Sequence, residues 1–152
     1  MSSQYVSLTK TALVEKLEQL FQEVRGLIEP LDDRALWAKP VEPGNSIGHL
    51  ALHLTGNLNF FVGRQLGHTD YTRDREREFT EKNFPPKEEL VNRLGEAVAL
   101  FRKVVSGLTE AQLSATYPEE KFGTVFKALT SLVVHFALHR GQISYVARLT
   151  KG

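Results

Sequence analysis

Histidine is the residue type whose spacing in this sequence suggests chemistry. Four of the five histidines form two His-x-x-x-His pairs, His49 with His53 and His135 with His139. Residues four apart share one face of a helix, so each pair can direct two imidazoles at one place. The second pair lies in the apolar stretch 132–139, which is expected to face a core, and two buried imidazoles are costly there unless each has a partner. A divalent transition metal is one partner for both, because neutral imidazole is a good ligand for zinc, nickel, iron or copper.

We predict a metal site with three ligands, His53, His135 and His139. A site built from two helices closes the coordination sphere better than one pair alone. His49 lies one turn before His53 and could be a further ligand, a neighbour that supports a ligand, or a surface residue. His68 follows Gly67 in a polar stretch, and we expect it to be exposed and without a role. The alternative for any single core histidine is a hydrogen bond to backbone or to a neighbouring side chain.

The residues around the histidines exclude several kinds of site. Leu50 and Phe136 stand directly after the first histidine of each pair, so the zinc-protease pattern His-Glu-x-x-His is absent. No Glu precedes any histidine by three residues, which argues against a bridged di-iron carboxylate site. The sequence has no cysteine, which excludes thiolate ligands and cysteine nucleophiles. Three histidines on one ion leave a position open for water or substrate, as in catalytic zinc sites.

Composition is that of an ordinary globular chain, and we expect one domain over residues 1–152. Nineteen basic and eighteen acidic residues give a formal net charge of +1, without a basic run of the kind that binds nucleic acid. No stretch approaches the roughly 18 apolar residues of a membrane span. Residues 1–10 do not resemble a signal peptide, so we expect a cytoplasmic protein without nucleic-acid or membrane partners.

Hydrophobic periodicity predicts an all-α fold. Four segments carry apolar residues at helical spacing, and they cover residues 13–28, 46–62, 86–107 and 124–149. Four amphipathic helices indicate a four-helix bundle. The connections 31–45 and 67–86 are longer than hairpins need, which leaves room for crossovers. Charges of alternating sign fill the second connection, and we expect a solvated surface there with fluctuating ion pairs.

Longer motifs surround the histidines. They are Asn45-Ser46-Ile47-Gly48, then Leu52-His53-Leu54-Thr55-Gly56-Asn57, and His135-x-x-x-His139-Arg140-Gly141-Gln142-Ile143 near the end. With these motifs the chain resembles the DinB-like, YfiT-like superfamily of metal-binding helix bundles. The stretch 72–79, rich in arginine and acidic residues, is similar to a subgroup of uncharacterised bacterial members.

That resemblance implies an up-down-down-up four-helix bundle, often a homodimer. It implies a divalent metal, zinc or nickel, held by one histidine of the second helix and two of the last, which are His53, His135 and His139 by motif position. Some members of the superfamily are transferases or isomerases that use a low-molecular-weight thiol. Because His49 is an extra histidine, the resemblance leaves open whether the site has three or four.

Our first functional hypothesis is a metal-dependent thiol transferase, or a related enzyme, that acts on a small electrophile. Asn57, one turn after His53, could supply a hydrogen bond to the site, and Arg140 could bind an anionic cosubstrate. The alternative is a non-catalytic metal-binding or stress-response protein whose metal is structural or vestigial. A purely structural bundle is the weakest hypothesis, since it gives the histidine pair of the last helix no purpose.

Overall fold

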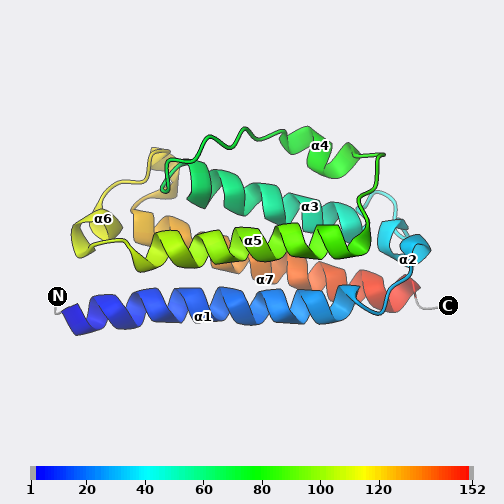
Figure 1. Ribbon diagram of the computed structural model, residues 1–152, viewed down its shortest axis with the longest axis horizontal. Helices are drawn as coiled ribbons and strands as arrows, with labels where there is room; N and C mark the ends of the chain where they lie inside the picture. The colour runs from blue at the N-terminus through cyan, green and yellow to red at the C-terminus, as the bar shows by residue number, and fades with distance from the viewer. Residues whose placement is uncertain (1–2, 151–152) are drawn as a thin grey trace.

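The computed structural model describes residues 3–150, and throughout this range the chain folds as a helical bundle (Figure 1). The elements in chain order are α1 (Ser3–Ile28), α2 (Asp33–Trp37), α3 (Ile47–Leu58), the π-helix η1 (Asn59–Arg64), α4 (Arg75–Thr80), α5 (Lys87–Ser106), α6 (Glu110–Ser114), the 3₁₀ turn η2 (Glu120–Phe122) and α7 (Val125–Thr150). Helices α1, α3, α5 and α7 are the four long members, which confirms the all-α bundle.

The order of the four long helices is up-down-down-up. In Figure 1, α1 and α7 run from left to right, whereas α3 and α5 run from right to left. Consecutive helices α3 and α5 can be parallel because the chain between them returns along the whole bundle, and this return carries α4. Helix α1 packs against α5 and α7, and α3 packs against α5, α7 and α4.

Helix α3 is the most deeply buried of the long helices, as its apolar residues on several faces predict. Ser46 caps its start, because the Ser46 hydroxyl accepts a hydrogen bond of 3.0 Å from the backbone N–H of His49. The helix continues as η1, where Gln65 N–H donates to the Phe60 carbonyl, five residues back. Buried side chains of α3 include His49, His53 and Asn57 as well as its apolar residues.

The connection 67–86 is more ordered than its alternating charges suggest. Asp74 accepts a hydrogen bond from the backbone N–H of Arg77 and caps α4, which packs on α3. Glu78 on α4 is only 7% exposed, and it is the one buried carboxylate among the described residues. Most charged residues of the segment are exposed, as expected, but the expectation was wrong for Glu78, whose partners hold α4 against the bundle.

Helix α7 buries one stripe of apolar side chains and exposes another. Leu132 and Phe136 lie in the core, whereas Val134 and Leu138 are 63% and 59% exposed. The stretch 132–139 thus faces the core on one side only, since a helix at the edge of a four-helix bundle contacts its neighbours with about half of its circumference.

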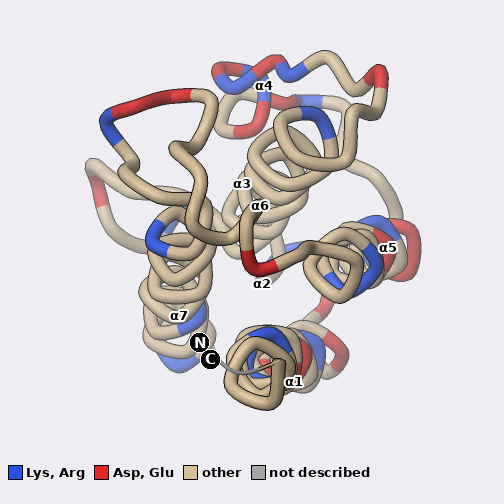
Figure 2. The backbone as a smooth tube through the Cα atoms, turned by 90° about the vertical axis from the view of Figure 1, so that its left-hand side faces the viewer, with Lys and Arg blue, Asp and Glu red and all other residues tan. Residues whose placement is uncertain are grey.

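Charged residues of both signs are interspersed over the bundle. Figure 2 shows basic and acidic positions side by side on α4 and α5. None of the helices among residues 3–150 has the length and apolar character that crossing a membrane requires.

Candidate metal centre

Helices α3 and α7 bring His53, His135 and His139 together. The Nε2 atom of His135 lies 3.0 Å from Nε2 of His53 and 3.1 Å from Nε2 of His139. One ligand atom from each of the three side chains lies within 4.8 Å of the others, so the group could hold a metal ion. His135 and His139 meet because they are one turn apart on α7, and His53 meets them because α3 packs against that face.

The distances from His135 to its two neighbours fit a transition metal. Imidazole nitrogens bind zinc at about 2.0–2.1 Å, so two ligands of one ion stand roughly 3–3.4 Å apart. The distances from His135 to the other two rings are at the lower end of this range. His53 is only 4% exposed, while His135 and His139 are partly exposed. The group is therefore closed on the α3 side and accessible from the α7 side.

The second ring nitrogen of His53 has a buried acidic partner. Nδ1 of His53 lies 3.0 Å from Oε1 of Glu78. Arg73 donates to both carboxylate oxygens of Glu78, from Nε and from Nη2, each at 2.9 Å. A carboxylate can only accept, so Nδ1 of a neutral His53 carries the proton and the lone pair of Nε2 faces His135.

The other two rings differ in what lies behind them. Nδ1 of His139 lies 2.7 Å from Oε1 of Gln142, one turn further along α7. Nδ1 of His135 is buried and has no hydrogen-bond partner within the described part of the chain. His53 and His139 are thus oriented by hydrogen bonds, whereas packing alone orients His135.

Burial keeps the imidazoles of His135 and His139 neutral. The pKa of His135 is lowered to about 4, chiefly by burial and then by the nearby His139, His53, Arg73 and Arg75, in that order. Burial also lowers the pKa of His139, against the opposite effect of its hydrogen bond with Gln142. A neutral imidazole is the form that binds a metal, so these two residues are ready to act as ligands at neutral pH.

Burial alone would raise the pKa of the Glu78 carboxyl. Hydrogen bonds from His53 and Arg73 outweigh this effect, and the pKa of Glu78 is lowered overall. Glu78 is consequently a carboxylate at neutral pH and remains a hydrogen-bond acceptor for His53.

His49 has different partners from those of His53. Its Nδ1 lies 2.6 Å from the Ser46 hydroxyl, and its Nε2 lies 2.8 Å from the backbone carbonyl of Glu81. Its ring also makes edge contacts with Trp37 and Phe84. Both nitrogens are therefore engaged in joining the start of α3 to the end of α4. His68 is exposed, as expected.

Two further residues named from the sequence lie close to the ligands in the chain. Asn57 is buried on α3, 5% exposed, one turn after His53. Arg140 points toward α1, since its Nη2 lies 3.6 Å from Oε1 of Glu23. Their roles toward a substrate stay predictions.

The sequence alone did not identify Arg73, Glu78, Phe79 or Gln142 as parts of this centre. Phe79 packs on His53 with ring centroids 4.7 Å apart, and the guanidinium of Arg75 lies over the Phe79 ring. Two local signals were present in the sequence. Asp74 is a residue type that caps helices, which indicates the start of α4, and Gln142 lies three residues after His139, a spacing that lets the two side chains meet on one helix face. Neither signal indicates which histidine α4 would meet.

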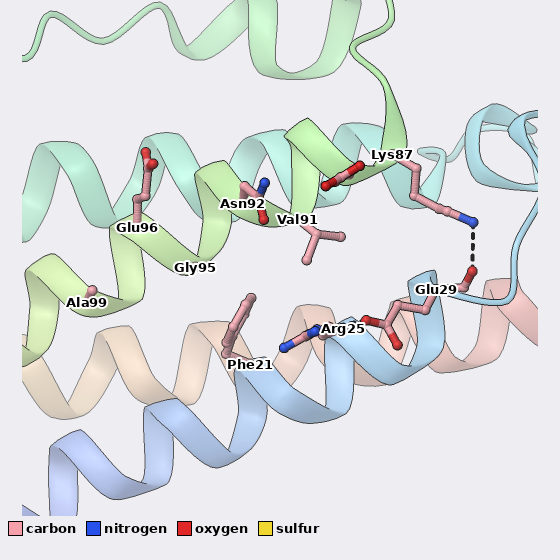
Figure 3. A pocket seen from close by; sticks show the side chains of 10 residues that line it. Phe21, Arg25, Glu29, Lys87, Val91, Asn92, Gly95, Glu96 and Ala99 are labelled. Carbon is pink, nitrogen blue, oxygen red and sulfur yellow. Dashed lines mark hydrogen bonds and ion pairs between the residues drawn. The ribbon is translucent and has the colours of Figure 1, made fainter.

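A groove of about 690 Å³ lies between α1 and α5 (Figure 3). Its lining includes Phe21, Gly95 and Arg25 and none of the three clustered histidines. The charges at one end are already paired, because Lys87 donates to the backbone carbonyl of Glu29 at 2.7 Å and Arg25 donates to the Glu29 carboxylate at 2.8 Å. The groove is thus separate from the candidate metal centre.

Comparison with known proteins agrees with this arrangement. The family model described as the DinB superfamily matches residues 16–143. Among curated proteins, none gives a significant match to the sequence. A solved structure, the crystal structure of a conserved protein from Enterococcus faecalis, superposes with a TM-score of 0.76 at 18% identity over 92% of this chain and 95% of that chain. At that identity, the similarity concerns the fold.

Proposed function

The chain belongs to the DinB superfamily, and from this premise we propose that it binds one divalent transition metal through His53, His135 and His139 and uses it in a thiol-transfer or related reaction on a small electrophile. The observation that carries the proposal is the convergence of three Nε2 atoms from two helices. Zinc and nickel are the metals we propose, because both accept neutral imidazole ligands.

The protein's own residues would hold such an ion on one side only. His53 is fixed from behind by Glu78, His139 is oriented by Gln142, and the partly exposed edge of α7 leaves access for a further ligand. Three neutral ligands leave the ion its full charge, and a divalent metal with an open position supplies Lewis acidity that favours the thiolate form of a thiol at neutral pH. Since the chain has no cysteine, the nucleophile in this proposal comes from a separate small molecule.

The alternative proposal is a non-catalytic metal-binding or stress-response protein. It is favoured by the extensive pairing around His53, because Glu78 and Arg73 would stabilise a bound ion whether or not a reaction takes place. The two proposals share the metal site and differ in whether an added ligand can reach the ion.

Elemental analysis tests the shared premise. The chain, purified without a histidine tag, is expected to contain about one divalent transition metal per molecule. A His135→Ala, His139→Ala double variant is expected to contain none. Stoichiometric metal in that double variant would overturn the ligand assignment.

We also propose that the protein is a homodimer, with a second copy packed on the exposed side of α7. Val134, Leu138, Tyr145 and Leu149 are all about half exposed or more, and they recur at helical spacing along that side. A net charge of +1 gives two copies little mutual repulsion. A dimeric mass in light scattering that becomes monomeric in a Val134→Glu, Leu138→Glu variant would support this, and a monomeric wild-type protein would overturn it.

A further inference from the structure

The contact between α4 and α3 depends on a space that one glycine leaves open. A Cβ atom added at Gly56 would lie 1.9 Å from Oε2 and 2.6 Å from Cδ of Glu78. The Glu78 carboxylate therefore occupies the position that any other side chain at residue 56 would fill. Glycine within a helix costs about 1 kcal/mol relative to alanine, so propensity alone favours alanine here.

The carboxylate cannot easily move out of this space. Arg73 donates one hydrogen bond to each carboxylate oxygen, and Nδ1 of His53 also contacts Oε1. The side chain of Arg73 is 11% exposed and that of Glu78 is 7% exposed, so this ion pair is shielded from water. A buried, bidentate arginine–carboxylate pair has a defined geometry, unlike an exposed pair.

Glu78 lies behind His53 and not among the ligand atoms. It contacts Nδ1, whereas the atom that approaches His135 is Nε2 on the opposite side of the ring. Glu78 is thus placed to orient the ring and to determine which nitrogen carries the proton. Ligand histidines of metal sites commonly donate their second N–H to a carboxylate, and this contact aligns the ring and raises its basicity.

We propose that Glu78, anchored by Arg73 and admitted by Gly56, is a positioning residue that fixes His53 as the Nδ1-protonated tautomer with its Nε2 lone pair directed at the metal site. The purpose of this arrangement rests on the proposed metal-binding function. The tautomer itself is a property of the metal-free protein, so the two proposals can fail separately.

The test measures the ring nitrogens of His53 directly. Long-range ¹H–¹⁵N spectra of ¹⁵N-labelled, metal-free protein at neutral pH distinguish a protonated from an unprotonated ring nitrogen. We expect His53 in the wild-type protein to show a protonated Nδ1 and an unprotonated Nε2. In Gly56→Ala and in Glu78→Ala we expect a mixture of both tautomers, because the acceptor is displaced or removed.

Matched controls separate this role from general stability. Gly26 lies within α1, and a Cβ there would meet nothing within 4 Å, so Gly26→Ala makes the same substitution without the displacement. Glu76→Gln removes an exposed carboxylate of α4. Both controls are expected to retain the wild-type tautomer of His53.

Zinc affinity, measured by competition with a chelating dye, is the second readout. We expect a loss of about 10–100-fold in Gly56→Ala and Glu78→Ala and no loss in the two controls. A wild-type His53 protonated on Nε2 would overturn the proposal, as would a Gly56→Ala variant with unchanged tautomer and affinity. If the wild-type protein binds no zinc but shows the expected tautomer, the metal function fails and the positioning role of Glu78 stands.

Discussion

The Nε2 atoms of His53 and His135 lie 3.0 Å apart, although 82 positions separate the two residues in the sequence. If both rings are neutral, at most one proton lies between these two nitrogens. If neither nitrogen is protonated, their lone pairs face each other. Close approach of several unprotonated ring nitrogens is the arrangement a metal ion requires. This relationship is the basis of the following predictions.

The two histidines of α3 should respond differently to mutation. His53→Ala is expected to abolish metal binding or weaken it greatly, because it removes a proposed ligand. His49→Ala is expected to change affinity by no more than about tenfold, the size of an indirect effect on a site. Isothermal titration of both variants with zinc measures the difference. The reverse order of affinities would mean that His49 is the ligand.

The stability of the same two variants provides an internal control. His49 is buried and its ring nitrogens contact Ser46 and the Glu81 carbonyl. Its replacement by alanine leaves buried polar groups unpaired, which costs about 1–3 kcal/mol. Urea unfolding of metal-free His49→Ala should therefore show reduced stability together with near-normal metal affinity.

Removal of the metal should lower the melting temperature. An ion that binds only the folded state stabilises it by about 2.7 kcal/mol when its free concentration is 100 times the dissociation constant. For a chain of this size, that corresponds to roughly 5–10 °C. Calorimetry with and without a chelator measures the shift, which should vanish in the His135→Ala, His139→Ala variant. An unchanged Tm after verified loss of the ion would contradict the ligand assignment.

The metal-free protein should lose stability as the pH falls from about 6.5 toward 4. The ordinary pKa of a histidine is 6.5, and in the folded protein the pKa of His135 is lowered to about 4, chiefly because burial disfavours the imidazolium. Between these values the unfolded chain binds a proton that the folded chain does not, so acidification favours unfolding. Urea midpoints measured in chelator across this range should fall more steeply for wild type than for His135→Gln.

That comparison isolates His135 from other acid-sensitive groups. Glu78 has a lowered pKa and also contributes stability that is lost on acidification, but it is present in both proteins. Equal slopes for wild type and His135→Gln would show that His135 is not held neutral by burial.

The fold and the histidine group were predictable because their signals are local. Apolar periodicity predicted the long helices, and the second predicted segment begins at Ser46, the residue that caps α3. His135 and His139 share a helix face by spacing alone. His53 was predicted as their partner because a two-helix site closes the coordination sphere better, and the family resemblance supported it over His49, which has the same spacing signal within its pair.

The support behind His53 was not predictable from the sequence. Glu78 is 25 positions from His53, in a segment where acidic and basic residues alternate. Alternation of this kind is typical of a solvated surface, and no periodicity separates one glutamate from its neighbours. Glu78 becomes the partner of His53 only because the chain places α4 over α3, and Gly56 leaves the space that the Glu78 carboxylate occupies.

The last prediction concerns catalysis. The metal-loaded protein, incubated with several low-molecular-weight thiols and chlorodinitrobenzene, is expected to form the thioether. In that reaction the thiolate sulfur bonds to the ring carbon, chloride leaves with the bonding electron pair, and the thiol proton passes to solvent. Little help from a general base is needed because the metal lowers the pKa of the thiol, which agrees with the lack of a glutamate directly beside the ligands in the sequence.

Variants of the two α3 histidines decide whether this activity belongs to the metal centre. Turnover should fall to background in His53→Ala and remain in His49→Ala, because His49 binds Ser46 and the Glu81 carbonyl and lies outside the three-histidine group. Equal activity in wild type and His53→Ala would assign the turnover to free metal or to another site. If no thiol reacts and titration shows that the bound ion accepts no added ligand, the centre is closed. The non-catalytic proposal then follows, since the open coordination position is what distinguishes a catalytic three-histidine site from a structural one.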